Sequence, residues 1–195
     1  MAHALATGTA GSRSGSGQGG PVTGEASGRA GRGEGDRLRY RRRLGARAVR
    51  DYGAETTPPD QIHAVECDAF APCGLGGISN DETIPKLRCS VVAGSANNQL
   101  ERPEHGKALQ ELGILYAPDF VVNAGGLINV ADELQGYKPE RAKASVENVY
   151  RTLREVFTTA RQDHISTAEA ADRFAQSRIH RISHVRLYWV PGGKS

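Results

Sequence analysis

Three short apolar segments, each closed by small residues or proline, limit most strongly how this chain can fold. They are CDAFAP at residues 67–72, SVVAGS at 90–95 and GILYAP at 113–118. Between the last two, residues 103–112 have the spacing of an amphipathic helix. Strands that alternate with helices predict a parallel β-sheet in an α/β fold. Ligands of such folds bind at the carboxyl ends of the strands, where these small residues lie.

From Asn123 onward the chain is predicted to be helical. Residues 139–162 place apolar side chains at spacings of one, three and four, which describes one helical face. Lys138-Pro139 is typical of a helix start, because proline is tolerated in the first turn. The sequence from Ser166 to Glu169 is a capping box that opens a last helix to about residue 182. Residues 183–195 are read as a tail.

The N-terminal arm, residues 1–45, has a different composition. Its first 36 residues hold 11 of the 24 glycines and show no apolar periodicity, so we expect this segment to be disordered. Residues 37–50 contain seven arginines and no acid, and their second half favours a helix that runs to about Tyr52. We therefore divide the chain into the arm, a body at residues 46–182 and the tail.

The net charge of +3 hides an asymmetry between arm and body. Ten arginines and three acids give residues 1–50 a net charge of +7, whereas residues 51–195 carry −4. The arginine-rich stretch leaves open a non-catalytic alternative, in which the arm binds an anionic partner electrostatically. Because no nucleic-acid-binding motif accompanies it, a solvated segment is the favoured interpretation and nucleic acid is not an expected partner.

The cysteines and histidines predict no metal site. Cys67, Cys73 and Cys89 form no C-x-x-C pair, and their odd number argues against a disulfide framework, so a reducing cytoplasm fits best. We expect Cys67 and Cys73 to pack as small apolar residues. Only His180 and His184 share helical i, i+4 spacing, and two ligands do not make a site. No apolar run is long enough to span a membrane, and no secretory signal is expected.

Three stretches rich in Gly, Ala and Asn carry the candidate chemistry. They are APCGLGGISNDET at residues 71–83, GSANNQL at 94–100 and PDFVVNAGGLINVADEL at 118–134. Small residues let the backbone approach a flat ligand closely, and asparagine offers both a hydrogen-bond donor and an acceptor. Together these stretches indicate a binding site at the carboxyl edge of the sheet.

In this order the three stretches resemble the leucine/phenylalanine/valine dehydrogenase group of the larger glutamate dehydrogenase family. The resemblance covers about residues 46–179, and residues 105–134 look closest to leucine dehydrogenases. It implies an incomplete Rossmann-like sheet, namely the second half of an NAD-binding domain, followed by C-terminal helices. It also implies that the chain is a C-terminal fragment of a cytoplasmic, homo-oligomeric oxidoreductase.

The resemblance implies oxidative deamination of an apolar, leucine-like L-amino acid to its 2-oxo acid. Hydride leaves the substrate Cα for the nicotinamide of NAD, and water hydrolyses the resulting imine. Residues that match the family's coenzyme-binding motifs are Ala71, Pro72, Cys73, Ala96, Asn97, Asn98, Asn123, Gly125 and Gly126. Residues implied to contact the amino acid substrate are Asn123, Val146 and Val149.

The sequence also departs from the family pattern. None of its five lysines lies in the family's Gly-Gly-x-Lys stretch, so we assign no catalytic residue and expect no turnover from this chain alone. GSGQGG at residues 15–20 has the letters of a dinucleotide-binding turn without a strand before it or a helix after it, and is read as a chance match. We interpret residues 1 to about 45 as out-of-frame translation or an erroneous start. A sheet lacking its first strands is then expected to expose an unpaired edge and to associate.

Overall fold

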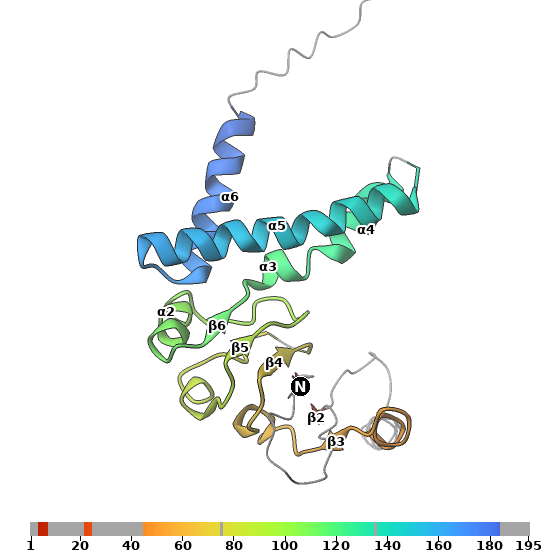
Figure 1. Cartoon of the computed structure of the whole chain (residues 1–195), viewed down its shortest axis with the longest axis vertical. Coiled ribbons are helices and arrows are strands. Elements are labelled where there is room, and N and C mark those ends of the chain that lie inside the picture. The colour runs from red at the N-terminus through yellow and green to blue at the C-terminus, as the bar shows by residue number, and fades with distance from the viewer. Residues whose placement is uncertain (1–3, 8–21, 25–44, 75, 135, 184–195) are drawn as a thin grey trace, which may run out of the picture.

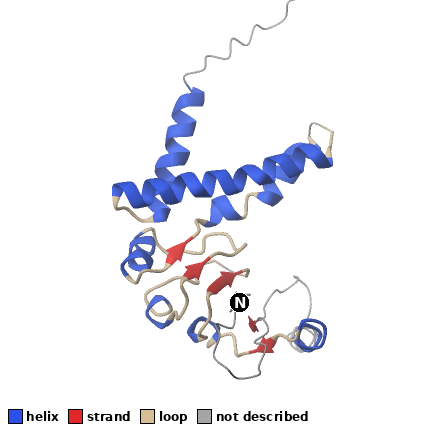
Figure 2. Cartoon of the chain, viewed as in Figure 1, coloured by secondary structure: helices blue, strands red, loops and turns tan. Residues whose placement is uncertain are grey.

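The computed structural model describes residues 4–7, 22–24, 45–74, 76–134 and 136–183. Figure 2 shows a body with strands at its centre and long helices gathered beyond one side of it. The strands are β1 (Ala4–Thr7), β2 (Val22–Gly24), β3 (Glu55–Thr56), β4 (Ala69–Pro72), β5 (Val91–Val92) and β6 (Leu115–Tyr116). The helices are an unlabelled one at residues 45–52, η1 (Ile62–Ala64), η2 (Ile84–Lys86), α2 (Glu104–Glu111), α3 (Asp119–Val122), α4 (Gly125–Glu133), α5 (Pro139–Asp163) and α6 (Thr167–Ser183).

The described strands form one sheet in the order β3-β2-β1-β4-β5-β6. β4, β5 and β6 are parallel, with Ala69 opposite Val91 and Val91 opposite Leu115. This confirms the predicted parallel arrangement of the three apolar segments, and each strand ends close to the predicted small residues. The α/β class followed by C-terminal helices is confirmed as well.

The main core lies where the parallel strands meet α2 and the two 3-10 helices. The apolar periodicity of residues 103–112 buries Leu109 completely, with Val92 and Phe70 beside it on the sheet. Burial of side chains of this size stabilises the fold by roughly 1.5–3 kcal/mol each. The buried members of this cluster are Ile62, Phe70, Ile84, Val92, Leu109, Ile114 and Tyr116.

A second core joins the C-terminal helices to each other and to α3. α5 begins at Pro139 as predicted and ends at Asp163, where the C-cap residue His164 takes a positive φ of 57°. α6 is capped as predicted, because the Glu169 N–H donates to Ser166 Oγ at 3.1 Å. Figure 1 shows α5 crossing the molecule beyond the β6 edge, with α6 leading away from its end. The buried residues of this second core are Val121, Val156, Ala160, Ala170 and Ala171.

The N-terminal arm differs from the sequence prediction at two places. Residues 4–7 and 22–24, expected to be disordered, are strands β1 and β2. β1 pairs antiparallel with both β2 and β4, with Leu5 opposite Ala71, so the edge of β4 that was expected to be unpaired is covered. The physical reason is that backbone pairing needs no apolar periodicity, only an open row of N–H and C=O groups. The GSGQGG motif at residues 15–20 and the tail at 184–195 lie outside the described residues.

Candidate functional site

The loops after β4 and β5 are in close backbone contact. The Ala96 N–H donates to the Pro72 carbonyl at 2.9 Å. A Cβ on Gly94 would lie 2.0 Å from the same oxygen, so no residue with a side chain fits this position without moving the backbone. Two of the predicted coenzyme-binding stretches, around Pro72 and around Ala96, therefore lie against each other.

The side chain of Gln99 holds the shape of the loop at residues 94–98. It is fully buried, and its Nε2 donates to the carbonyls of Gly94 at 2.7 Å and Ala96 at 2.9 Å. Its backbone N–H donates to Asp119 Oδ2 at 2.7 Å, which connects this loop to the first turn of α3. Sequence reasoning missed Gln99 and Asp119, and the only signal in the sequence was their position within the unusual stretches.

The glycine-rich turn after β4 closes over the same loop. The Gly77 N–H donates to the Asn98 carbonyl at 2.7 Å. A Cβ on Gly76 would lie 2.7 Å from that carbonyl oxygen and 2.8 Å from the carbonyl oxygen of Asn97, so glycine is required here too. Asn98 itself has a positive φ of 51°, a conformation that asparagine tolerates better than most residues.

Asn123 completes the arrangement from the end of α3. Its Nδ2 donates to Asn97 Oδ1 at 2.5 Å, a contact between side chains 26 residues apart in the chain. Asn97 and Asn98 are exposed and Asn123 is half-buried, so all three amides are accessible from the same edge. The predicted residues from the loops after β4, β5 and β6 are thus brought together at the carboxyl ends of the parallel strands.

The other predicted residues extend from this centre along α4 and α5. A Cβ at Gly125 or Gly126 would meet no atom within 4 Å, so the face beside Asn123 is open. Val149 is half-buried and packs against the second core, whereas Val146, one turn earlier on α5, is 46% exposed. The two valines therefore have different surroundings, although both belong to the helix that packs on α3.

The electrostatics of the site favour binding over proton transfer. Asp119 is occupied by backbone groups, because its Oδ1 accepts from the Phe120 N–H at 2.6 Å and its Oδ2 from Gln99. Burial and the nearby Asp119 carboxylate raise the pKa of Tyr116, so the phenol stays neutral at physiological pH. The side chains at Asn97, Asn98 and Asn123 are uncharged amides, which can both donate and accept hydrogen bonds.

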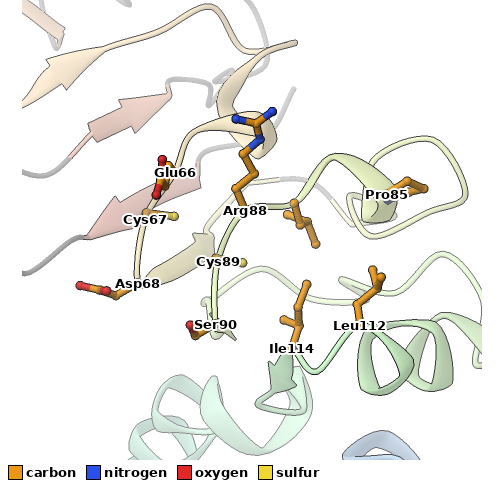
Figure 3. A pocket seen from close by; sticks show the side chains of 10 residues that line it. Glu66, Cys67, Asp68, Pro85, Arg88, Cys89, Ser90, Leu112 and Ile114 are labelled. Carbon is orange, nitrogen blue, oxygen red and sulfur yellow. The ribbon is translucent and has the colours of Figure 1, made fainter.

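Two larger hollows flank the strands at opposite ends. A groove of about 520 Å³ beside the carboxyl end of β6 is lined by residues that include Asn98, Asp119 and Phe120. A cavity of about 750 Å³ lies at the amino ends of β4, β5 and β6, with Cys67 and Cys89 in its wall (Figure 3). The sequence analysis anticipated the carboxyl side alone, because ligands of α/β sheets commonly bind there.

His105, which the sequence left without a role, is held in a charged cluster. It is buried at the start of α2, its Nδ1 accepts from the Arg102 N–H at 3.1 Å, and its Nε2 lies 3.0 Å from Asp81 Oδ1. Arg102 also binds Asp81, at 2.6 Å. Both ring nitrogens are thus occupied by structural partners, and the cluster joins the turn before η2 to the start of α2.

Among the described residues, no group of three or more His, Cys, Asp or Glu side chains is placed to hold a metal ion. Of the arginines in the basic stretch at residues 37–50, the structure describes Arg47 and Arg50, so the basic-arm alternative stays a prediction. In the helix at residues 45–52, Arg47 and Arg50 both bind Asp51, at 3.1 and 2.8 Å, which neutralises part of the basic stretch. His180 lies exposed on α6, while His184 is outside the described residues. No helix in the described part of the chain is long and apolar enough to cross a membrane.

Comparison with known proteins matches most of the chain. A family model for glutamate/leucine/phenylalanine/valine dehydrogenases matches residues 37–186, a somewhat wider range than the predicted 46–179. Leucine dehydrogenase of Geobacillus stearothermophilus is 53% identical over 148 residues, which is 76% of this chain and 40% of that protein. Leucine dehydrogenase of Thermoactinomyces intermedius is 58% identical over 140 residues, covering 72% and 38%.

A solved structure of another amino acid dehydrogenase is also similar to this chain. The crystal structure of L-tryptophan dehydrogenase from Nostoc punctiforme is similar with a TM-score of 0.68 at 46% identity, covering 70% of this chain and 42% of that one. The chain spans about 40% of the length of the curated relatives that it matches.

Proposed function

The chain belongs to the glutamate/leucine/phenylalanine/valine dehydrogenase family, and on that basis we propose that it carries the nicotinamide side of the NAD site of an L-amino acid dehydrogenase. The observation that carries this proposal is the contact of Asn123 with Asn97 at the carboxyl edge of the sheet. It joins the NAGG and SANN stretches, which resemble the family's coenzyme motifs, beside an open face at Gly125 and Gly126.

The residues present fit this end of NAD. A nicotinamide carboxamide and a ribose hydroxyl each need a donor and an acceptor, and the amides of Asn97, Asn98 and Asn123 offer both. The close approach at Gly94 and the bonds from Gln99 hold these amides in place before any ligand binds. Preorganised groups of this kind bind with little loss of conformational entropy.

The proposed reaction is oxidative deamination of an apolar, leucine-like L-amino acid. NAD, when bound, accepts the hydride that leaves the substrate Cα. Val149 and Val146 on α5 would line the side-chain end of the substrate. The identity of leucine, phenylalanine and L-tryptophan dehydrogenases to this chain supports an apolar L-amino acid as substrate, and the leucine-like side chain is our proposal.

Catalysis needs a further group that moves a proton, and the site described here offers amides instead. General acid–base catalysis contributes typically 10²–10⁴-fold to a rate. We therefore propose that this chain binds coenzyme weakly and does not turn over. Incubation of the purified chain with L-leucine and NAD is expected to give no NADH above a protein-free control.

The binding proposal is tested by saturation-transfer NMR of NAD with the full chain. We expect the nicotinamide protons to receive more saturation than the adenine protons. Asn123→Ala should weaken binding roughly three- to tenfold, because one hydrogen bond of this kind contributes about 0.5–1.5 kcal/mol.

The matched control is Asn129→Ala on α4, whose amide donates to Glu133 Oε1 at 3.1 Å on the exposed surface. This variant is expected to bind NAD like the parent chain. Absence of any transfer to NAD, or equal weakening by both substitutions, would overturn the nicotinamide-side assignment.

A further inference from the structure

Two cysteines lie directly opposite each other at the amino edge of the sheet. The parallel ladder pairs Glu66 with Arg88 and Ala69 with Val91. In that register Cys67 faces Cys89, and the Cys67 N–H donates to the Arg88 carbonyl at 3.0 Å. Side chains at matching positions of neighbouring parallel strands leave the sheet on the same face, with the strands about 4.8 Å apart.

Both thiols open into the cavity of about 750 Å³ at this edge. Figure 3 shows the two sulfur atoms on the same side of their strands, with Ile114 and Leu112 forming the apolar wall beyond them. Both cysteines are half-buried against the main core, so their positions are set by packing. A small organic group can therefore reach both sulfur atoms from one opening.

The surroundings keep the pair in the thiol form. Burial raises the pKa of Cys89 to about 11, with a contribution from Cys67, and burial also raises the pKa of Cys67. A protonated thiol is a poor nucleophile, so reagents that need a single thiolate react slowly here. A reagent that takes up two neighbouring thiols forms a more stable adduct than a reagent on one thiol, since its second bond forms within the same complex.

We propose that Cys67 and Cys89 form a dithiol site that chelates a trivalent arsenical, a thiophilic centre that binds two sulfur atoms. With an organic arsenoxide, two As–S bonds form and the arsenic–oxygen double bond breaks. The oxygen leaves as water with the two thiol protons, and arsenic stays trivalent. Zinc fits less well, because it takes four ligands and the described residues offer no third His, Cys, Asp or Glu ligand here.

The probe is phenylarsine oxide, added to the full chain in excess 2-mercaptoethanol so that adducts on single thiols do not persist. Intact mass spectrometry should show one phenylarsenic group in place of two thiol protons. Dithiothreitol should remove it. Because the ligand bridges the strands that enter β4 and β5, the wild-type melting temperature should also rise.

Substitutions identify the two sulfur atoms. Cys67→Ser and Cys89→Ser should each lose both the adduct and the thermal shift. Cys73→Ser is the matched control, because Cys73 lies beyond the opposite end of β4. This substitution should leave the adduct and the thermal shift unchanged. If a serine variant fails to fold by circular dichroism, the alanine variant at the same position replaces it.

Peptide mapping keeps the outcome independent of those variants. Trypsin cuts between the two cysteines, at Lys86 and Arg88. In the adduct of the Cys73→Ser chain, the peptides that contain Cys67 and Cys89 should be joined through arsenic. No stable adduct on the parent chain, an adduct that survives in either single variant, or loss of the adduct in Cys73→Ser would each overturn the proposal.

Discussion

Asp132 is the residue that connects the two helices after the candidate site. It is buried at the end of α4, its Oδ2 accepts from the Lys138 N–H at 2.7 Å, and its Oδ1 pairs with Arg141 on α5. The Arg141 guanidinium and the Lys138 N–H hold the pKa of this carboxyl below its usual range. Asp132 thus links the end of α4 to the first turn of α5.

We expect Asp132→Asn to lower the free energy of unfolding at neutral pH, because a charged pair and its hydrogen bonds are lost. A carboxyl with a depressed pKa in the folded state contributes stability above its unfolded pKa of about 3.9. That contribution is lost as the pH falls through the lower folded value. The difference between parent and variant, measured by urea unfolding, should therefore shrink below about pH 4.

Asp163→Asn supplies the control for this prediction. Asp163 pairs with Arg173 at 3.3 Å, but both side chains are about half exposed. Exposed ion pairs contribute little, so this variant should stay close to the parent at every pH. If both substitutions lowered the free energy of unfolding equally, the buried position of Asp132 would not be the cause of its effect.

At the scale of elements, α5 changes character along its length. Its second half buries Val156 and Ala160 against α6, whereas Val146 and Tyr150 in its first half are exposed. The apolar stripe read from the sequence is therefore only partly covered by the described residues. Helix periodicity determines which residues share a face, and the neighbouring elements determine which part of that face is buried.

This difference predicts unequal costs for one substitution at two positions. Val156→Ala removes two methyl groups from a fully buried site and should lower the free energy of unfolding by about 2 kcal/mol. Val146→Ala, 46% exposed on the same helix, should change it by less than about 0.5 kcal/mol. Urea unfolding followed by circular dichroism compares the two variants, and a similar loss from both would mean that Val146 is also packed.

At the scale of the whole molecule, several exposed apolar side chains of the described residues gather on and just after α4. Leu127 is 75% exposed, Leu134 86% and Val130 54%. Figure 1 shows α4 and the neighbouring first half of α5 extending away from the sheet. Association was predicted from an open sheet edge, but β1 pairs with the edge of β4. The exposed apolar residues of α4 offer another surface for association.

We expect the chain to associate with itself as its concentration rises, because apolar patches of this kind favour burial. Leu127→Glu combined with Leu134→Glu should shift the sedimentation profile toward the monomer. Ile179→Glu, at an equally exposed apolar position on α6, is the control and should have a smaller effect. A concentration-independent monomer in the parent chain would contradict the prediction.

The sequence by itself determined the elements and the family. The strand segments, the helices at α2, α5 and α6, the Pro139 start and the Ser166 cap follow from signals within a few residues of each other. The motifs of the proposed coenzyme site were likewise readable as local stretches. The composition and apolar pattern of the N-terminal arm did not predict β1 and β2. Strand pairing uses backbone N–H and C=O groups, which every sequence carries.

Only the tertiary structure decided which distant residues meet. Asn97 and Asn123, 26 residues apart, come together because β5 and β6 are parallel and end at the same edge. The same register places Cys67 opposite Cys89 at the other edge. The register of a sheet is set by pairing between segments and by the packing of one face, so no local pattern encodes it. Local chemistry thus identified the residues, and the sheet determined their partners.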